Sequence, residues 1–115
     1  MAYACKVVEN EPDESELIKR YGYFDNGKQI GKCAIKLYSR GKHKGAYLLM
    51  NVVIEETYRG KGLCGKFLKC VLKRYSGKVV FLSVLIDNIP AVKCYEGLGF
   101  VEVERGRSTL WMRKA

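Results

Sequence analysis

The sequence predicts a single α/β domain whose sheet is mixed and mostly antiparallel, and three observations support this prediction. A chain of 115 residues is long enough for one hydrophobic core and too short for two. Two nearly all-apolar runs, residues 46–55 and residues 78–86, are typical of buried strands and flank an amphipathic helix. Short strand-like segments joined by glycine-containing turns indicate hairpins near both ends. Together these features define a mixed sheet packed against helices.

The N-terminal third is expected to hold three strands and one short helix. Residues 4–9 (ACKVVE) form a strand candidate, and residues 13–20 form a short helix with an N-cap signal at its start. Residues 21–24 and 29–38 are strands. The Asn-Gly pair between them supplies the positive φ angles that a tight hairpin turn needs.

The rest of the chain alternates strands and helices. Strand 46–55 leads through a glycine-rich turn into a helix of three to four turns. The apolar side chains of this helix recur at helical spacing and are Leu63, Phe67, Leu68, Val71, Leu72 and Tyr75. Strand 78–86 precedes a short helix over residues 89–97, and residues 100–104 and 109–113 close the chain as an antiparallel hairpin. Because the two long strands are nearly all apolar, both faces of each are expected to be buried.

Composition narrows the class of protein. With 48% hydrophobic and 29% charged residues, a disordered or collagen-like chain is excluded. No apolar run reaches the about 20 residues that a membrane helix needs, and the first residues lack a signal-peptide pattern, so we expect a soluble, cytoplasmic protein with no membrane partner. The five cysteines are odd in number and form no C-x-x-C pair. We therefore expect small buried apolar residues in a reducing compartment, with neither a disulfide framework nor a metal site.

The formal net charge of +9 is concentrated in the middle of the chain. Residues 31–80 hold twelve Lys and Arg residues against only two acidic ones, whereas residues 1–30 are net negative. Such a segment attracts a polyanion or a phosphate-bearing cofactor. Nucleic acid is the obvious polyanion, although a solvated lysine-rich face explains the charge equally well.

The glycine-rich turn before the first long helix carries the first chemical signal. Its three glycines let the backbone approach a bulky anion, and the start of the helix offers unpaired N–H groups and the positive end of its dipole. Arg59, Lys61 and Lys66 add positive charge, which suits a pyrophosphate. The turn matches neither a P-loop nor G-x-G-x-x-G, and a basic glycine turn before a helix is by itself more often a purely structural feature.

Together with a second segment, this turn resembles the GNAT superfamily of acetyl-coenzyme A-dependent N-acetyltransferases. The signature of that superfamily is R/Q-x-x-G-x-G/A at a strand-to-helix turn, followed about 25–30 residues later by N-x-x-A-x-x-x-Y-E-x-L-G-F. Arg59, Gly62 and Cys64 occupy the first motif, with a cysteine at its last small position. The second motif is complete and consists of Asn88, Ala91, Tyr95, Glu96, Leu98, Gly99 and Phe100. The specific match covers residues 46–101, and the N-terminal part agrees only in its pattern of strands.

The resemblance implies one GNAT domain over residues 1–115, with splayed central strands 46–55 and 78–86, two main helices and a reduced N-terminal helical region. It further implies that the pantetheine arm of acetyl-coenzyme A lies in the gap between the splayed strands, and that no metal takes part. The cofactor-binding residues that it implies are Val52, Val53, Ile54, Arg59, Gly60, Lys61, Gly62, Leu63, Cys64, Gly65, Lys66, Asn88 and Tyr95.

The chemistry of acetyl transfer suits these residues. Attack of a primary amine on the thioester creates an oxyanion, which a backbone N–H of strand residues 52–54 can stabilise. The departing thiolate needs a proton, and the phenol of Tyr95 can donate it as a general acid. Packing beneath the last hairpin is the alternative role of Tyr95, and helix capping is that of Asn88. We expect direct transfer in a ternary complex, because Cys64 and Cys94 are expected to be buried beside or within helices.

A general base is missing from the pattern. The two positions at which many relatives carry a glutamate hold Leu48 and Ser83 here. Three other carboxylates near strand ends could act only through water, and these are Glu55, Glu56 and Asp87. His43, the single histidine, lies in a lysine-rich loop. Because only one short helix fits between the first two strands, the acceptor site is expected to be open or completed by a second subunit.

The sequence therefore predicts an N-acetyltransferase that uses acetyl-coenzyme A and a small cationic amine or a protein amine as acceptor. An acidic stretch could attract a cationic acceptor or simply be solvated, and it consists of Glu9, Glu11, Asp13, Glu14 and Glu16. Two alternatives remain, an acyl-coenzyme A-binding module without turnover and a basic RNA- or ribosome-binding domain. Nucleic acid is the less expected partner, and a homodimer is compatible with the sequence.

Overall fold

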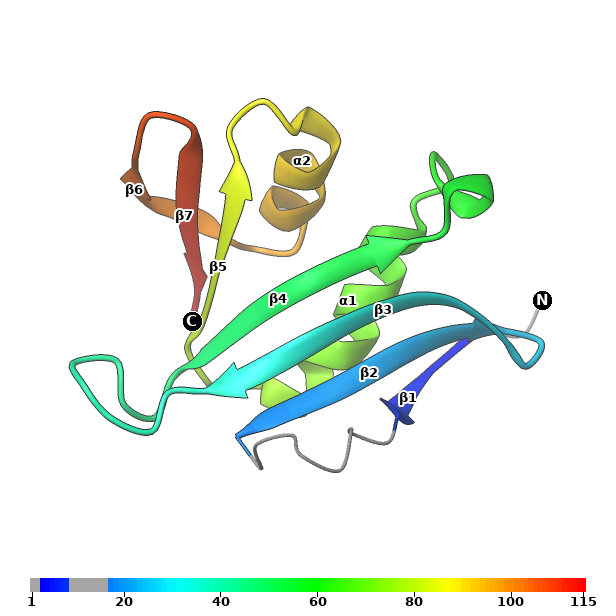
Figure 1. Cartoon of the computed structure of the whole chain (residues 1–115), viewed down its shortest axis with the longest axis horizontal. Coiled ribbons are helices and arrows are strands. Elements are labelled where there is room, and N and C mark those ends of the chain that lie inside the picture. Colours follow the sequence, from blue (N-terminus) through cyan, green and yellow to red (C-terminus); the bar gives the residue numbers. More distant parts are fainter. Residues whose placement is uncertain (1–2, 9–16) are drawn as a thin grey trace.

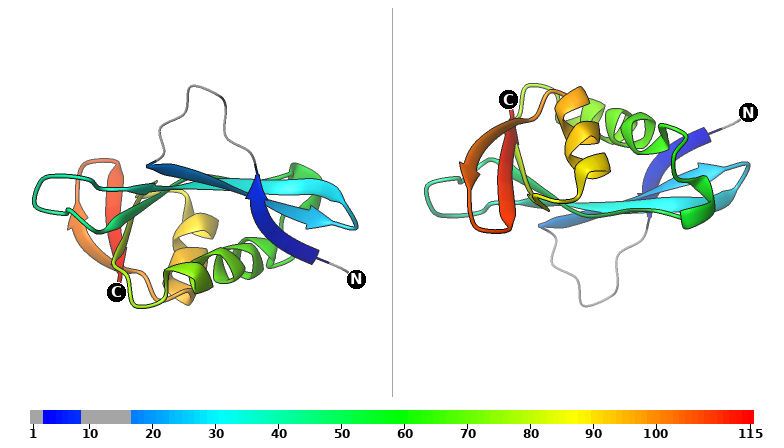
Figure 2. Two further views of the ribbon diagram at one scale, coloured as in Figure 1. Left: turned by 90° about the horizontal axis from the view of Figure 1, so that it is seen from below. Right: turned by 90° about the horizontal axis from the view of Figure 1, so that it is seen from above.

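The computed structural model describes residues 3–8 and 17–115, which form a seven-stranded sheet in the order β1-β2-β3-β4-β5-β7-β6 (Figure 1). Strands β4 and β5 run parallel, and all other neighbouring strands are antiparallel. The two α-helices of the described residues lie on the same face of the sheet (Figure 2). The predicted fold class, a mixed and mostly antiparallel sheet with two main helices, is confirmed.

Within the described residues four strands precede helix α1, and their bounds are β1 Tyr3–Val8, β2 Ile18–Asp25, β3 Lys28–Leu37 and β4 Tyr47–Ile54. The predicted hairpin turn between β2 and β3 is confirmed. Asn26 and Gly27 have φ angles of 49° and 90°, which match the positive φ that the Asn-Gly pair was expected to supply.

The short helix expected over residues 13–20 is wrong where the structure describes it. β2 begins at Ile18, whose Cα partner on β3 is Lys36, so the chain is already part of an antiparallel ladder there. Ladder hydrogen bonds and the burial of Tyr21 and Tyr23 further along β2 outweigh the local N-cap signal. Residues 9–16, which include the rest of this prediction and the acidic stretch, lie outside the described residues.

The remaining elements are η1 Glu56–Tyr58, α1 Leu63–Leu72, η2 Lys73–Tyr75, β5 Val80–Leu85, α2 Ile89–Gly97, β6 Val101–Arg105 and β7 Thr109–Lys114. The predicted apolar stripe of α1 is confirmed for Leu63, Phe67, Leu68, Val71 and Leu72, which are all buried, whereas Tyr75 lies beyond α1 in η2 and is half-buried. β6 and β7 form the predicted C-terminal hairpin, and β7 is the strand that pairs with β5.

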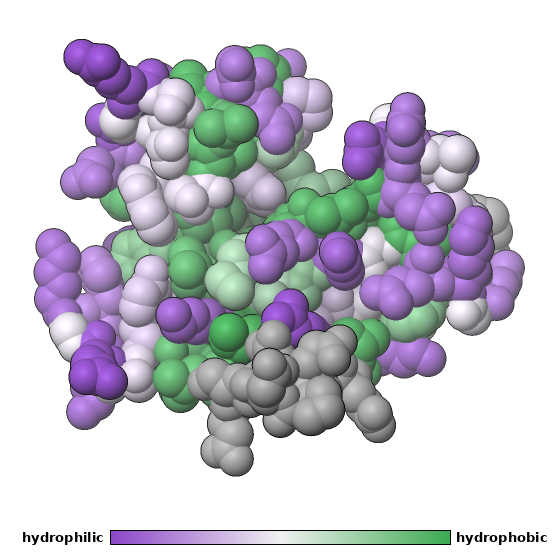
Figure 3. Space-filling view, in the orientation of Figure 1, coloured by the Kyte–Doolittle hydropathy of each residue, from purple (hydrophilic) through white to green (hydrophobic). Residues whose placement is uncertain are grey.

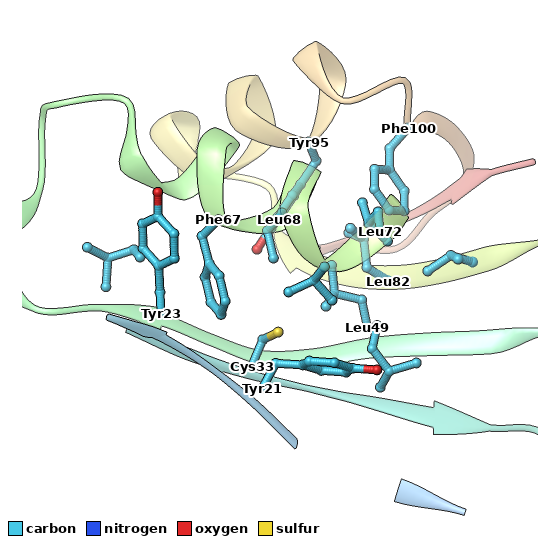
Figure 4. Packing of buried hydrophobic residues seen from close by; sticks show 14 of the residues in the cluster. Tyr21, Tyr23, Cys33, Leu49, Phe67, Leu68, Leu72, Leu82, Tyr95 and Phe100 are labelled. Carbon is cyan, nitrogen blue, oxygen red and sulfur yellow. The ribbon is translucent and has the colours of Figure 1, made fainter. Parts of the chain in front are cut away.

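The hydrophobic core lies between the sheet and the two helices (Figure 4). Phe67 of α1 is fully buried and stacks on Tyr23 of β2, with ring centroids 5.0 Å apart. The expectation that both faces of the long strands are buried is wrong, because both helices cover the same face. On β5, Leu82 faces the helices and is 2% exposed, whereas Leu85 on the uncovered face is 56% exposed.

Strands β4 and β5 pair only at their N-terminal ends, which confirms that the central strands splay. The paired residues are Tyr47 with Val80 and Leu48 with Phe81, and no ladder joins the two strands beyond these pairs. The backbone of β4 after Leu48 therefore has no partner strand on the β5 side. A gap of this kind exposes backbone groups that an extended ligand can pair with.

A bulge in β4 marks the region of the splay. Asn51 has a φ angle of 57°, in the left-handed region, and the register between β3 and β4 shifts beside it. Asparagine tolerates this conformation better than the apolar residues around it, and a bulge bends its strand. The polar residue within an otherwise apolar run was the sequence signal for this bulge, which was not among the predicted features.

Replacing Asn51 by valine is expected to lower the free energy of unfolding by about 2 kcal/mol, because a β-branched residue resists a positive φ. The Asn51 side chain is exposed, so the loss of its own contacts should contribute little. Asn51→Gly is the matched control and should unfold near the wild-type midpoint, since glycine accepts this backbone. Urea denaturation measures both, and equal stability of the two variants would show that the bulge is not strained.

The cysteines depart from the expectation that the chain has no disulfide. Cys5 of β1 and Cys70 of α1 are joined by one, although they lie 65 residues apart in sequence. They meet because α1 packs against β1, a through-space contact that cysteine spacing does not reveal. Cys33 is buried, as expected, whereas Cys64 and Cys94 are only half-buried, so the expectation of burial is wrong for these two. The described part of the chain contains no group of His, Cys, Asp and Glu suited to a metal ion, and none of its helices combines the length and apolarity needed to span a membrane.

Candidate active site

A groove of about 910 Å³ opens where β4 and β5 diverge, between the start of α1 and helix α2. This volume falls within the ~300–1,000 Å³ that is typical of small-molecule sites. Eleven of the thirteen predicted cofactor-binding residues line it, namely Val52, Ile54, Arg59, Gly60, Gly62, Leu63, Cys64, Gly65, Lys66, Asn88 and Tyr95. Segments from two distant motifs thus share one cavity.

The remaining two predicted residues, Val53 and Lys61, do not line the groove. Val53 alternates with Val52 and Ile54 along β4, so its side chain lies on the uncovered face and is 41% exposed. Pairing of the Val53 backbone with the pantetheine arm, which the resemblance implies, stays a prediction. Lys61 places its Nζ 5.4 Å from the ring centroid of Tyr58.

The start of α1 is built as an anion-binding helix terminus. Gly62 is its N-cap residue with a φ of 73°, which a glycine adopts without strain. A glycine N-cap has no side chain to accept from the leading N–H groups, and the first turn of α1 carries no acidic residue. A Cβ placed on Gly65 would meet no atom within 4 Å, so the groove is open beside this turn. The free backbone N–H groups at the start of α1 therefore favour the binding of a phosphate.

Basic side chains surround the helix start. Arg59 donates a hydrogen bond from Nε to the carbonyl oxygen of Ile54 over 2.8 Å, which ties the turn to the end of β4. Lys66 and Lys69, one turn apart on α1, line the groove together with Lys93 of α2. Motif reasoning missed Lys69 and Lys93, although the i, i+3 spacing of Lys66 and Lys69 places them on one helix face. Four cationic side chains thus converge on this cavity.

Asn88 has the capping role that was its alternative explanation. Its Oδ1 accepts a hydrogen bond from the backbone N–H of Ala91 over 3.4 Å, so it is the N-cap residue of α2. Both residues also line the groove. The cap uses only the carboxamide oxygen, which leaves a ligand-binding role for the NH₂ group compatible with the structure.

Tyr95 projects from α2 into the core and also lines the groove (Figure 4). Its side chain is 8% exposed, and its ring packs edge-on against Phe100 with centroids 6.1 Å apart. Burial raises the pKa of the Tyr95 phenol above its usual value, and the thiols of Cys64 and Cys94 act in the same direction. The hydroxyl therefore keeps its proton at neutral pH, as a general acid must.

Two cysteines meet on one side of the groove. Cys64, the second residue of α1, has its Sγ 2.8 Å from the Sγ of Cys94 on α2. The hydrogen bond from the Cys94 thiol lowers the pKa of Cys64 and raises that of Cys94. Neither motif predicted this contact, because the two residues are 30 positions apart.

No aspartate, glutamate or histidine is among the described residues that line the groove. Glu55 is exposed and lies 3.9 Å from Lys28 in an ion pair. His43 packs on Phe81, with ring centroids 4.6 Å apart, in a different cavity. Ser83 is exposed on β5, and the structure brings neither Glu56 nor Asp87 into the groove lining. The structure thus adds no candidate base to those considered from the sequence.

A second cavity, of about 970 Å³, lies at the opposite ends of β4 and β5. It combines the aromatic residues Tyr38, Phe81 and Trp111 with the basic residues Lys42, His43, Lys44, Lys78 and Arg113 and with one acidic residue, Glu104. Phe81 alternates along β5 with buried Leu82, so this cavity lies on the uncovered face of the sheet. Figure 3 shows that face, with hydrophilic side chains gathered over the loop between β3 and β4. Basic side chains therefore line both cavities.

The splayed central strands and the uncapped helix start are two features that the resemblance to N-acetyltransferases implies. The chain belongs to the acetyltransferase (GNAT) family, whose model matches residues 3–100. This match confirms the resemblance drawn from the two motifs, and it places the chain among the acetyl-coenzyme A-dependent N-acetyltransferases.

Relatives of known structure or activity agree with this assignment. The chain is 30% identical over 104 residues to the spermine/spermidine N(1)-acetyltransferase of Bacillus subtilis, an alignment that covers 84% of this chain and 68% of that protein. The ribosomal-protein-S18-alanine N-acetyltransferase of Escherichia coli has a TM-score of 0.79 at 15% identity and covers 98% of this chain and 93% of its own. The PaiA N-acetyltransferase of Thermoplasma acidophilum, solved with coenzyme A, has a TM-score of 0.69 at 20% identity. The match spans 84% of this chain but only 60% of that protein.

Proposed function

We propose that the protein transfers an acetyl group from acetyl-coenzyme A to a primary amine by direct attack in a ternary complex. The observation that carries this proposal is the groove itself, because it joins the unpaired edge of β4, the N-terminus of α1 and the Tyr95 side chain in one cavity. Family membership and the coenzyme A complex of the Thermoplasma acidophilum protein support the choice of cofactor.

The cofactor would be held by its phosphates at one end and by its pantetheine arm at the other. The N–H groups at the start of α1 suit the pyrophosphate, and Arg59, Lys66, Lys69 and Lys93 supply compensating charge. The pantetheine amides can then pair with the free backbone edge of β4 in the manner of an added strand. This placement directs the thioester toward the interior end of the groove, where Tyr95 lies.

The reaction then needs two groups of this chain. When the amine attacks the thioester carbonyl, a backbone N–H within residues 52–54 stabilises the oxyanion. Collapse of the tetrahedral intermediate breaks the carbon–sulfur bond, and Tyr95 gives its phenolic proton to the departing thiolate. Because burial keeps Tyr95 protonated, this proton is available throughout the neutral range.

Two classes of acceptor are supported by the relatives. The Bacillus subtilis relative is described as acting on spermine and spermidine, and the Escherichia coli structure is that of an enzyme for a ribosomal-protein alanine. A small cationic amine and a protein amine are therefore the two candidates for this chain. The hypothesis that the acidic stretch attracts a cationic amine rests on residues outside those described.

The acceptor amine is expected to arrive already neutral, because the described residues lining the groove include no aspartate, glutamate or histidine to take its proton. For an alkyl amine with a pKa near 10, kcat/KM should rise about tenfold per pH unit between about pH 7 and 9. For a peptide N-terminus the rise should level off above about pH 8, near the α-amino pKa. Deprotonation of Tyr95 should not lower kcat/KM in this pH range, since burial raises the pKa of its phenol and keeps it protonated. Initial rates for both acceptors test this, and one shared plateau would reveal a base in the enzyme.

The proposal is tested by incubating the protein with acetyl-coenzyme A and a panel of amines while free thiol and acetylated product are measured. Spermidine, a peptide with a free N-terminal alanine and an arylalkylamine should form the panel. Equal amounts of thiol and acetylated amine with at least one of them are expected. Binding of acetyl-coenzyme A without turnover of any amine would favour the non-catalytic module.

A second function, binding of a polyanion such as single-stranded RNA, is favoured by the second cavity. Aromatic rings interleaved with basic side chains stack on bases and pair with phosphates. The triple variant Lys42→Ala, Lys44→Ala, Arg113→Ala should weaken binding of a labelled oligoribonucleotide at least about tenfold and reduce its salt dependence, while acetyl transfer is retained. Fluorescence anisotropy measures this, and equal binding by the variant would remove the cavity as an RNA site.

A further inference from the structure

Cys64 is the residue at which the chain departs from the turn motif. The last small position of that motif, glycine or alanine in the resemblance described above, holds a cysteine here. Its sulfur touches that of Cys94 at 2.8 Å, and both residues line the groove beside Tyr95. A covalent sulfur–sulfur bond is about 2.0 Å long, so a movement on the order of 1 Å would join the two helices.

We propose that Cys64 and Cys94 form a redox-active dithiol site, at which a hydroperoxide converts the pair to a disulfide between α1 and α2. The site lies in the groove assigned above to acetyl-coenzyme A, and only the effect of that cofactor rests on the proposed function. The acetyl-transfer mechanism uses neither thiol.

The two sulfurs have different parts in the reaction. Cys64 is the attacking group, because the N-terminus of α1 and the hydrogen bond from Cys94 both favour its thiolate. Cys94 keeps its proton and lies within reach as the resolving thiol. The geometry therefore provides an attacking thiolate, Cys64, and a resolving thiol, Cys94, in contact with it. A lone buried cysteine has no such resolving thiol.

The oxidation balances in two steps. The Cys64 thiolate attacks the peroxide, the oxygen–oxygen bond breaks, and Cys64 becomes a sulfenic acid while the released hydroxide takes a proton to become water. The Cys94 sulfur then attacks the Cys64 sulfur, loses its proton and expels a second water. Two thiols and one hydrogen peroxide give one disulfide and two waters.

The third free cysteine provides an internal control. Cys33 is 3% exposed, and burial raises the pKa of its thiol to about 12. A thiol of this kind is slow to react with peroxide. Cys5 and Cys70 are already joined in a disulfide. Oxidation should therefore consume two of the three free thiols and leave Cys33.

The test treats the folded protein with hydrogen peroxide, then unfolds it, alkylates the remaining thiols and measures the intact mass and the peptide map. We expect the number of alkylated thiols to fall from three to one, with a cross-linked peptide that contains Cys64 and Cys94. In Cys94→Ser, Cys64 should stop at the sulfenic acid and be trapped by dimedone, whereas Cys33→Ser should still form the cross-link. Three alkylated thiols after treatment, or oxidation of Cys33 in place of the pair, would overturn the proposal.

A parallel reaction with saturating acetyl-coenzyme A, which has no free thiol to consume the peroxide or reduce the cross-link, separates this inference from the proposed function. A bound cofactor should cover the groove lining and slow formation of the cross-link by about tenfold or more, since access governs cysteine oxidation. Cross-linking that acetyl-coenzyme A does not slow would support the dithiol site and count against the groove as the cofactor site. Absence of the cross-link in both reactions would overturn the dithiol site alone.

Discussion

Tyr95→Phe is expected to lower kcat by roughly 10²-fold, because it removes the proton donor to the departing thiolate. The phenylalanine ring retains the packing against Phe100, so the free energy of unfolding should change by less than about 1 kcal/mol. Coenzyme A affinity should stay within about twofold, since the substitution deletes only one hydroxyl. Steady-state rates, calorimetric binding and urea denaturation measure the three quantities.

Tyr75→Phe is the matched control for this prediction. The Tyr75 hydroxyl lies 2.7 Å from that of Tyr21, outside the groove, so its loss should cost about 1 kcal/mol of stability and leave kcat unchanged. The two variants thus separate chemistry from packing. Wild-type kcat in Tyr95→Phe would exclude the general-acid role, and a loss of coenzyme A affinity with kcat retained would make Tyr95 a binding residue.

Gly65→Val is expected to weaken coenzyme A binding by about two orders of magnitude. Gly65 is within α1, and its missing side chain leaves open space at the helix start where the pyrophosphate is proposed to lie. A valine at this position occupies the space proposed for the anion. It should not destabilise the helix, because valine is a better helix former than the glycine it replaces. Isothermal titration with coenzyme A measures the effect.

Gly65→Ala provides the stability reference, because alanine in place of a helical glycine should stabilise the fold by about 0.5–1 kcal/mol. Gly62 is the less suitable position, since its φ of 73° would strain any β-branched replacement and mix folding with binding. A folded Gly65→Val protein that binds coenzyme A with wild-type affinity would remove the start of α1 from the cofactor site.

Local signals predicted most of the fold. The apolar stripe of α1 and the Asn26-Gly27 turn depend on neighbouring residues, and both are found where they were expected. Features that depend on tertiary context were not predictable. Whether Leu85 is buried depends on which face the helices cover, and the Cys5–Cys70 disulfide depends on how α1 packs on β1.

The two motifs also predicted most of the residues that line the groove, but they did not predict which of these residues contact one another. They did not indicate that Lys69 and Lys93 would share the lining, because Lys69 lies outside both motifs and Lys93 is at a variable position of the second. The contact between Cys64 and Cys94 joins positions in different motifs, and its geometry arises only when α1 and α2 lie side by side. The bulge at Asn51 was readable in principle, since a lone asparagine in an apolar strand favours a positive φ.

Amide hydrogen exchange, measured with and without acetyl-coenzyme A, tests the central claim most directly. The claim is that the groove between the splayed strands, the start of α1 and α2 is where the cofactor binds and reacts. Exchange should slow in residues 52–54, 59–66 and 88–95, and it should not change in the loop of residues 39–45, which borders the second cavity. Protection confined to that loop, or no protection at a saturating concentration of acetyl-coenzyme A, would contradict the account.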